Sequence, residues 1–499
     1  MIKQRTTTAR TRPDLRPGTQ REDGAGREVG SRLLDLLRGL DAAAPEQLAR
    51  IQRMQPPPAP TTIAETGISE IVLTKLLLKA MHVGALRTVP QLVKGMKLTV
   101  AVVEQLLQAA AGRKLVEVAG SDVQGLVPIL EYGLSDIGRR WAADAYEQSQ
   151  YLGPVPVPLA TYAAQIERQR IGHQSFDPAG VGAAVADLVF DPMLLDSIGP
   201  AIAARRSILL YGPPGNGKIS IAERIGRLFT DIIFVPYAIE VDNQIIRVFD
   251  ARLHGASEAV DDPPSSDFAI RREDYDERWV ACRRPVAMAG GELTLEMLEV
   301  RAAERAGFYD APLHVKAMGG IFVIDDFGRQ LVNPKALLDR WIVPLEKRVD
   351  YLKLHTGKSF SLPFDELVVF STNMEPEDLM DPAFLRRIPY KIEIGEPSEA
   401  AYREIFGQVI ANRRLDMPAA LVDFVVAELR RRGVALACYQ PSFIAAQIVS
   451  ACRFAGRPAV ADEARILAAL ANLSTRRAPV GAPPPAPGAP ARATGSGGR

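Results

Sequence analysis

Residues 207–218 read SILLYGPPGNGK, a short apolar run followed by a loop rich in glycine and proline. The apolar run is typical of a strand buried in a parallel sheet. Apolar residues at Ile221, Ile225 and Leu228 then predict an amphipathic helix. A glycine-rich loop between a strand and a helix lets backbone N–H groups surround phosphate oxygens, and the helix N-terminus adds positive potential. The stretch therefore predicts a phosphate-binding site. Its residues are Gly212, Pro213, Pro214, Gly215, Asn216, Gly217, Lys218, Ile219 and Ser220.

One position departs from what magnesium binding needs. In loops of the form GxxxxGK the next residue is Ser or Thr, and its hydroxyl binds Mg²⁺. Here that residue is Ile219. Ser220 follows, but one residue along a helix rotates the side chain by about 100°, so we expect its hydroxyl to point away from the metal. Because isoleucine is β-branched like threonine, we expect the loop to fold and to hold a nucleotide while lacking one magnesium ligand.

A second apolar run ends in two acids. Residues 320–324, GIFVI, predict another buried strand, and Asp325 and Asp326 follow it. A carboxylate at such a strand end can hold Mg²⁺ through water, and a second one can position or polarise an attacking water. The pair resembles a Walker B element, and this resemblance implies that Asp325 is a metal ligand and that Asp326 is catalytic.

Two later stretches add polar groups of the same kind. Residues 367–370, LVVF, predict a further strand, and Asn373 follows it closely. An amide there can orient a water near the terminal phosphate. Residues 381–387, DPAFLRR, end in Arg386 and Arg387. This stretch resembles one in AAA+ proteins that ends in an arginine, which stabilises transition-state charge in a neighbouring subunit. The resemblance favours Arg387 over Arg386 for this role, because Arg387 aligns better with the usual pattern.

In this order and spacing, the elements resemble the AAA+ family of P-loop NTPases over roughly residues 185–475. The resemblance implies an α/β core with a parallel sheet, followed by a C-terminal helical lid. It identifies residues 212–218 as a Walker A loop, Asp325 and Asp326 as a Walker B pair, and Asn373 as sensor 1. It also implies ATP and Mg²⁺ as cofactors, hydrolysis of ATP to ADP and phosphate that Ile219 would impair, and a homo-oligomeric ring such as a hexamer.

Further features refine this resemblance. Residues 337–352 predict a helix that leads into a strand, and residues 353–363 predict a hairpin. This arrangement is similar to the hairpin that MoxR-type AAA+ proteins carry before sensor 1. Two positions depart from the family: Asp326 stands where glutamate is usual, and the stretch YQPSF at residues 439–443 has no arginine where sensor 2 is expected.

The segment before the core reads as a small domain of its own. Residues 62–152 predict three helices, a β-hairpin and a last helix, a pattern similar to a winged-helix domain. The third helix, at residues 99–111, would read DNA, but it has no Arg or Lys in its middle. Base and phosphate contacts usually need such residues. Nucleic acid therefore remains possible as a partner but is not favoured, and we favour docking of a protein, as yet unknown.

The chain divides into parts by composition and pattern. The expected order is a disordered tail at 1–30, a helix and Pro-rich linker at 31–61, the winged-helix-like domain at 62–152, a connector at 153–174, the core at 175–395, the lid at 396–475, and a disordered Pro/Ala/Gly tail at 476–499. We also expect a long insertion at about 245–318, between the second core strand and Asp325. Its Phe308–Tyr309 pair suggests a pore contact to polypeptide or, alternatively, ordinary packing.

The bulk composition excludes several classes of protein. The 60 basic and 59 acidic residues nearly cancel, so no global field points to nucleic acid or to an acidic membrane. Three scattered cysteines argue against a disulfide framework. The histidines show no metal-binding spacing, and no apolar run approaches the ~20 residues that span a bilayer. We therefore expect a cytoplasmic protein without membrane insertion.

Three functions stay open at this point. The first is a ring-forming ATPase that remodels a protein partner. The second is a nucleotide-binding scaffold with weak or no hydrolysis, which Ile219, Asp326 and the absent sensor 2 arginine favour. The third is a DNA-binding regulator that ATP controls.

Overall fold

The fold was obtained as a computed structural model. It describes residues 56–124, 127–171, 182, 186–189, 192–229, 231–255, 275–303 and 306–473. The tail expected at 1–30, the helix expected at 31–53 and the tail expected at 476–499 lie outside the described residues. Within them, no helix is long and apolar enough to cross a membrane.

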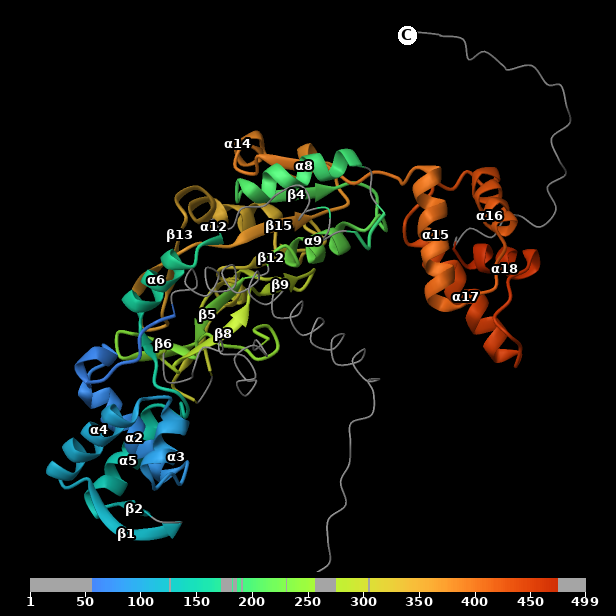
Figure 1. The fold of residues 1–499 in the computed structure, drawn as a ribbon. Helices are drawn as coiled ribbons and strands as arrows, with labels where there is room; N and C mark the ends of the chain where they lie inside the picture. The colour runs from blue at the N-terminus through green and yellow to red at the C-terminus, as the bar shows by residue number, and fades with distance from the viewer. Residues whose placement is uncertain are drawn as a thin grey trace, which may run out of the picture. The chain divides into compact units, whose positions relative to one another are not determined.

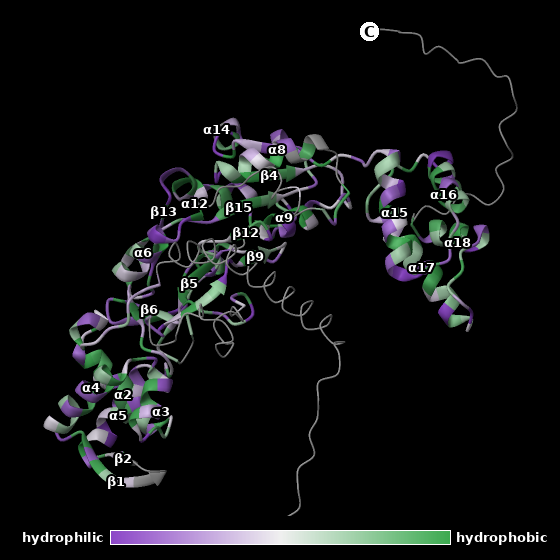
Figure 2. Ribbon diagram, viewed as in Figure 1, coloured by the Kyte–Doolittle hydropathy of each residue, from purple (hydrophilic) through white to green (hydrophobic). Residues whose placement is uncertain are grey.

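A five-stranded parallel sheet forms the centre of the core (Figure 1). Its strands are, in spatial order, β16 (Tyr390–Glu393), β4 (Ile208–Tyr211), β15 (Leu367–Ser371), β12 (Ile321–Ile324) and β9 (Val286–Ala289). The three apolar runs singled out in the sequence are thus β4, β12 and β15. Figure 2 shows the hydrophobic character of these strands.

Helices cover both faces of this sheet. Alternate residues of a strand point to opposite faces of the sheet. Accordingly, alternate residues of β12 and of β15 belong to two different hydrophobic clusters, one on each face. One cluster joins the sheet to α8 (Pro192–Ala203) and α9 (Lys218–Gly226). The other joins it to α12 (Pro334–Lys347), whose Trp341 is 2% exposed. The chain therefore has an α/β fold in which the strand ends are held rigidly from both sides.

The position of the second core strand differs from the sequence prediction. The run IIFVP forms β5 (Ile232–Pro236), which pairs antiparallel with β8 (Trp279–Arg283) in a separate sheet. The neighbour of β12 is instead β9, which lies inside the insertion expected at 245–318. The inserted residues therefore precede this strand. Both runs are short and apolar, and hydrophobic periodicity does not say which of them pairs with β12.

A second five-stranded sheet combines one strand that precedes the core sheet in sequence with four strands that lie between β4 and β12. It contains β10 (Arg301–Ala302), β11 (Tyr309–Asp310), β7 (Gln244–Arg247), β6 (Ala238–Val241) and β3 (Val157–Pro158), in that order. For Phe308 and Tyr309, the structure favours ordinary packing, the alternative to a pore contact. Phe308 packs edge-on against Tyr151, and Tyr309 is 2% exposed with its hydroxyl 2.6 Å from Nδ1 of His355.

The N-terminal elements agree with their predicted order. They are α2 (Glu70–His82), α3 (Val89–Met96), α4 (Val100–Gly112), the antiparallel pair β1 (Val116–Gln124) and β2 (Val127–Leu134), and α5 (Asp136–Gln148). Short hydroxyl side chains begin each helix, because their oxygens accept from backbone N–H groups of the first turn. These residues are Ser69, Thr88, Thr99 and Ser135.

A buried ion pair ties these helices to the inserted strands. Arg278 and Asp276 have side chains that are each 3% exposed, and the guanidinium binds both carboxylate oxygens. Arg278 Nη1 also donates to the carbonyl oxygens of Thr66, at 3.0 Å, and Pro156, at 3.2 Å. One side chain therefore connects the N-terminal helices, the connector and the residues before β8.

The hairpin expected at 353–363 is confirmed. After α12 the chain forms β13 (Val349–Lys353) and β14 (Ser359–Pro363), which pair antiparallel from Val349 with Pro363 to Lys353 with Ser359. Asp350 anchors the hairpin, since its buried carboxylate accepts from His314 Nε2 at 2.8 Å and Arg340 Nη1 at 2.7 Å. The C-terminal helices are α15 (Glu399–Arg413), α16 (Ala419–Arg431), α17 (Gln440–Phe454) and α18 (Glu463–Leu473), which share one apolar cluster.

Glu366 is a buried carboxyl immediately before β15. The residue is 2% exposed, and neither carboxyl oxygen has a hydrogen-bond partner within the described part of the chain. Burial raises the pKa of Glu366 well above its ordinary value; Asp350 and Asp365 raise it further, and Arg348 opposes them. The folded protein therefore keeps this proton at a pH where the unfolded chain has lost it.

Glu366→Gln should become increasingly stable relative to the parent, measured as the free energy of unfolding, as the pH rises. The unfolded chain releases the proton near pH 4.5, while the folded parent retains it, so the parent loses stability between that pH and the raised pKa. The variant has no proton to release. Denaturant midpoints at about pH 5 and about pH 8 measure this. A difference between the two proteins that does not change with pH would contradict the buried, protonated state of Glu366.

Candidate functional site

A cavity of about 670 Å³ opens where β4, β12 and β15 end. Parallel strands present their carboxyl ends at one edge of a sheet, which is where ligands of such folds bind. The cavity is lined by residues from the glycine-rich loop, the strand ends, the segment before α8 and the C-terminal helices. They are Asp187, Leu188, Val189, Pro214, Gly215, Asn216, Gly217, Lys218, Ile219, Ser220, Asp325, Asp326, Arg329, Ser371, Asn373, Ile405, Gln408, Cys438 and Tyr439.

The loop between β4 and α9 needs its glycines. Gly212 has φ of 125°, and a Cβ there would lie 2.6 Å from the carbonyl oxygen of Ile394 on the strand beside it. Gly215 and Gly217 have φ of 82° and 87°, in the left-handed region that other residues rarely adopt. The loop can therefore turn tightly against the sheet and enter α9 with its backbone N–H groups free for a ligand.

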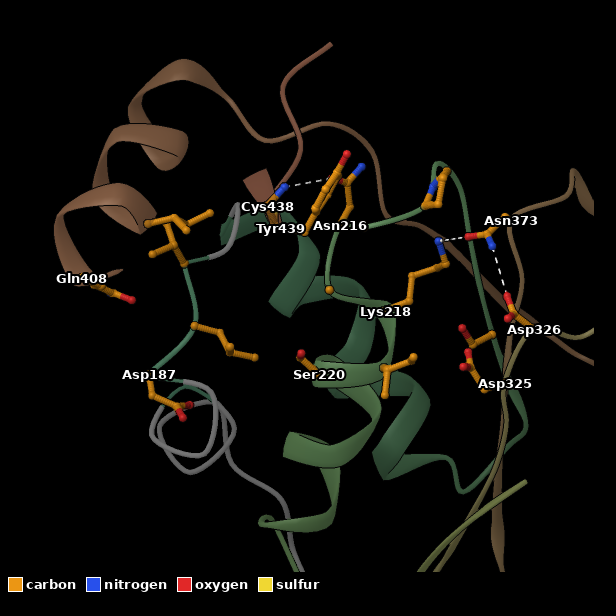
Figure 3. Close-up of a pocket in the computed structure, with 18 of the residues that line it drawn as sticks. Asp187, Asn216, Lys218, Ser220, Asp325, Asp326, Asn373, Gln408, Cys438 and Tyr439 are labelled. Atoms are coloured by element: carbon orange, nitrogen blue, oxygen red, sulfur yellow. Dashed lines mark hydrogen bonds between the residues drawn. The ribbon is translucent and has the colours of Figure 1, made fainter. Parts of the chain in front are cut away.

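Lys218 is the centre of a hydrogen-bond network (Figure 3). Its Nζ donates to the carbonyl oxygens of Gly212 at 2.8 Å and Pro213 at 2.9 Å, and to Oδ1 of Asn373 at 2.6 Å. Nδ2 of Asn373 donates to Oδ1 of Asp326 at 3.2 Å. Residues 155 positions apart in the sequence are thus joined in one chain of contacts.

Electrostatics at Lys218 favour a bound anion. Burial lowers the pKa of the Lys218 ammonium from its ordinary value, while the nearby carboxylates of Asp325 and Asp326 raise it. A buried cation gains most from an additional negative partner, because the surrounding dielectric is low. Phosphate oxygens that displaced the two loop carbonyls would meet this need.

The C-terminal helices contact the loop directly. The backbone N–H of Tyr439 donates to the carbonyl oxygen of Gly215 at 3.0 Å, and that of Cys438 donates to Oδ1 of Asn216 at 3.2 Å. A Cβ on Gly215 would lie 2.4 Å from Cδ1 of Tyr439. Nδ2 of Asn216 is buried without a partner within the described residues. The start of α17 therefore rests on the loop at the stretch where sensor 2 was expected.

This contact predicts different costs for two glycine substitutions. Gly215→Ala and Gly217→Ala both place a side chain at positive φ, which costs about 1–2 kcal/mol. Only the first also drives a methyl group into Tyr439, because a Cβ on Gly217 meets nothing within 4 Å. Overpacking of this kind costs about 1–3 kcal/mol more.

Urea denaturation without nucleotide measures the two variants. The excess loss in Gly215→Ala should shrink when Tyr439→Ala is added, because the smaller side chain removes the clash. Equal losses in both glycine variants would mean that Tyr439 does not rest on the loop in solution.

The structure brings together most, but not all, of the predicted site residues. Asp325, Asp326, Asn373 and residues 214–220 line the cavity, whereas Gly212 and Pro213 contact it through Lys218. Ser220 is among the lining residues, so its expected direction away from a metal stays a prediction. Arg386 and Arg387 do not line the cavity; Arg387 Nε donates to Oε1 of Glu346 on α12 at 2.6 Å.

Sequence reasoning missed several lining residues. Most of them come from segments far from the loop in sequence and carry no recognisable pattern, namely Asp187, Leu188, Val189, Ile405, Gln408 and Cys438. Tyr439 belongs to the stretch where sensor 2 was expected, but it was not predicted to line the cavity. Ser371 and Arg329 lie close to predicted motifs and had a signal. Ser371 ends β15 one residue beyond the pairing of Phe370 with Ile324, and Arg329 follows Asp326 after three residues.

Comparison with known proteins gives distant matches. A domain of unknown function, DUF8689, matches residues 398–472. No curated protein matches the chain. Among solved structures, NtrX from Brucella abortus is 14% identical, with a TM-score of 0.28, over 56% of this chain and 46% of that one. The RuvB Holliday junction branch migration motor of Thermotoga maritima is 13% identical, with a TM-score of 0.32, over 57% of this chain and 70% of that one.

These likenesses are partial and weak. The chain spans less than half the length of the NtrX chain. A RuvB mutant with a TM-score of 0.34 is 12% identical over 58% of this chain. The chain has an α/β fold with a five-stranded parallel sheet and C-terminal helices, distantly similar to these proteins over a little more than half of its length.

Proposed function

We propose that the chain is an AAA+-type ATPase that binds ATP with Mg²⁺ in this cavity and hydrolyses it slowly. The observation that carries the proposal is the hydrogen-bond network from Lys218 through Asn373 to Asp326, which begins where the glycine-rich loop enters α9. It joins a phosphate-binding cation, a water-orienting amide and a carboxylate in one place. That combination serves phosphoryl transfer and has no evident use in packing alone.

The residues present fit Mg²⁺ only together with a nucleotide. No cluster of three or more His, Cys, Asp or Glu side chains that could hold a metal occurs in the described residues. Mg²⁺ is commonly held by one or two carboxylates, waters and substrate phosphates. Asp325, which lines the cavity beside Asp326, would supply the carboxylate. When bound, the ion would neutralise charge on the phosphates.

The residues of the chain would act on ATP as follows. Lys218 would leave the carbonyl oxygens of Gly212 and Pro213 and bind the outer phosphates. Asn373 would hold a water in line with the terminal phosphorus, and Asp326 would orient it through its carboxylate. Because Asp326 is one methylene shorter than glutamate, we expect this orientation to be looser and the turnover to be low.

We further propose that assembly completes the site. Arg387 lies outside the cavity of its own chain and would reach a nucleotide in a neighbouring subunit, with Arg386 as the alternative. Arg387 first has to leave Glu346, whose carboxylate it contacts at 2.6 Å. Light scattering with and without ATP tests this: ATP-dependent oligomers support it, and full activity of a strict monomer contradicts it.

The remaining parts suggest what the motion would act on. The hairpin β13–β14 before sensor 1 favours the MoxR-type group, and the N-terminal elements favour a winged-helix-like module that docks a protein. The middle of α4 offers Glu104 and Gln105 but no cation, so DNA is a weaker candidate partner. The N-terminal module would move together with the strands β5 and β8, because Arg278, just before β8, donates to the carbonyl oxygen of Thr66 in that module.

Ile219→Thr should raise ATP turnover by about tenfold or more, since a lost metal ligand returns. The side chain of Ile219 is 38% exposed and lines the cavity, so the smaller threonine fits without repacking. Steady-state phosphate release at a fixed Mg²⁺ concentration is the measurement, with Ile219→Val as the control for shape. High turnover in the parent and no change in Ile219→Thr would show that position 219 does not limit hydrolysis.

A nucleotide-binding scaffold is the second candidate. It is favoured by two cavity-lining residues that differ from the AAA+ pattern: Ile219, where Ser or Thr is usual, and Asp326, where Glu is usual. In that case Ile219→Thr would not start hydrolysis, while ATP would still bind and change the assembly state.

A further inference from the structure

The chain makes a tight turn directly after its two acids. Asp326 has φ of 48° and Gly328 has φ of 99°, both in the left-handed region. The N–H of Arg329 donates to the carbonyl oxygen of Asp326 at 2.9 Å and closes the turn. A non-glycine residue at positive φ is uncommon and persists where its surroundings fix it. The strand end is therefore folded back on itself next to the cavity.

Neighbouring residues hold this turn from several sides. Phe327 is fully buried; its N–H donates to the carbonyl oxygen of Ser371 at 2.8 Å, and its own carbonyl accepts from Oγ1 of Thr372 at 2.7 Å. Gln330 donates to the carbonyl oxygen of Asp325 at 3.0 Å and accepts from the N–H of Gly328 at 2.8 Å. Backbone freedom at Arg329 is therefore small.

Arg329 lines the same cavity as Lys218, Asp325 and Asp326. Its guanidinium makes no hydrogen bond or ion pair with the residues that the structure describes. Arg329 is exposed, whereas Arg284 and Arg340 occupy buried and half-buried positions and each bind a carboxylate at 2.7 Å. The turn thus presents an unpaired cation to the cavity on a fixed backbone.

The position of the turn points to one end of a bound nucleotide. Figure 3 shows Asn373, Asp325 and Asp326 on one side of Lys218, and Gln408 and Asp187 on the other. In the proposed function the first side takes the terminal phosphate. Arg329 lies three positions after Asp326, on the turn that this carboxylate begins.

We propose that Arg329 binds the γ-phosphate of ATP held in its own subunit. This inference rests on the proposed function and names a further residue of that site. The stretch where sensor 2 was expected holds Tyr439, which cannot supply a positive charge at neutral pH. Arg329 would supply one from the turn after β12, with a planar group whose donors match phosphate oxygens.

Affinities for a non-hydrolysable ATP analogue and for ADP test the proposal. Binding of each, with Mg²⁺, is measured for the full chain, Arg329→Ala, Arg329→Lys and the control Lys335→Ala. Lys335 is an exposed lysine six residues further on that does not line the cavity. A charge-assisted contact to the γ-phosphate alone predicts about a tenfold or larger loss for the analogue in Arg329→Ala. ADP should bind within about twofold of the parent, Arg329→Lys should recover part of the loss, and Lys335→Ala should match the parent.

Other outcomes overturn the inference. Equal losses for the analogue and ADP would mean that Arg329 supports the fold or acts by general charge. An unchanged analogue affinity would remove it from the site, and a loss seen only in assembled protein would place it in trans. Arg329→Gln, which keeps the aliphatic stem, replaces Arg329→Ala if the latter does not fold. A parent chain that binds neither nucleotide contradicts the proposed function and this inference together, whereas a parent that binds both leaves only the inference at stake.

Discussion

Lys218→Ala is expected to lower the affinity for ATP by about 100-fold or more, the largest functional effect of any single substitution. Lys218 is 6% exposed, and its Nζ donates hydrogen bonds to Gly212, Pro213 and Asn373. Removing it takes away the one buried cation of the loop and leaves these acceptors without their donor. Hydrogen bonds to charged groups contribute about 1.5–3 kcal/mol each, and about 1.4 kcal/mol corresponds to tenfold in affinity.

Equilibrium titration with a fluorescent ATP analogue measures this loss. Lys391→Ala is the matched control, because Lys391 also donates to a backbone carbonyl, that of Ile388 at 2.9 Å, but does not line the cavity. The control should bind like the parent. Comparable binding by Lys218→Ala and the parent would show that phosphates do not contact the loop.

Arg278→Ala is expected to destabilise the folded chain by about 3–5 kcal/mol, the usual cost of breaking a buried ion pair. The substitution leaves the Asp276 carboxylate buried without its guanidinium and frees the carbonyl oxygens of Thr66 and Pro156. Thr66, Pro156 and the Asp276–Arg278 pair belong to three different segments, so the loss should reach beyond one element.

The matched control for this prediction is Arg283→Ala, because Arg283 is exposed at the end of β8. Urea denaturation followed by circular dichroism should show a clear shift of the midpoint in Arg278→Ala and little change in Arg283→Ala. A loss under about 1 kcal/mol in Arg278→Ala, typical of an exposed pair, would contradict the connecting role of this residue.

The sequence was most informative where local pattern and chemistry coincide. Polar or charged residues follow each of the runs 207–211, 320–324 and 367–370, directly or within a short loop, and a parallel sheet places such residues at one edge. Lys218, Asp326 and Asn373 could therefore be predicted to meet, and they do. The hairpin at 353–363 was predicted from a turn near residues 356–358 and from the similarity to MoxR-type proteins.

Other features depend on contacts that a single sequence does not encode locally. β5 and β9 are both short apolar runs, and the choice of β9 beside β12 follows from long-range packing. The placement of Tyr439 on Gly215 joins residues more than 220 positions apart. Phe308 and Tyr309 were equally compatible with a pore and with a core, because an aromatic pair suits both.

Arg329 shows a different limit. Its distance from Asp326 is visible in the sequence, but its direction depends on a turn with two left-handed residues. In a sequence, only glycine reliably indicates a left-handed backbone conformation. Asp326 adopts this conformation as well, and its residue type did not predict it. The side chain that the structure brings to the cavity was therefore not predictable from spacing alone.

Calorimetric titration of the purified chain with ATP and Mg²⁺ tests the central claim most directly. The account predicts saturable binding of one nucleotide per chain, which ADP competes away and which Lys218→Ala loses. Absence of saturable binding in the parent, or binding that survives in Lys218→Ala, would contradict the assignment of this cavity to ATP.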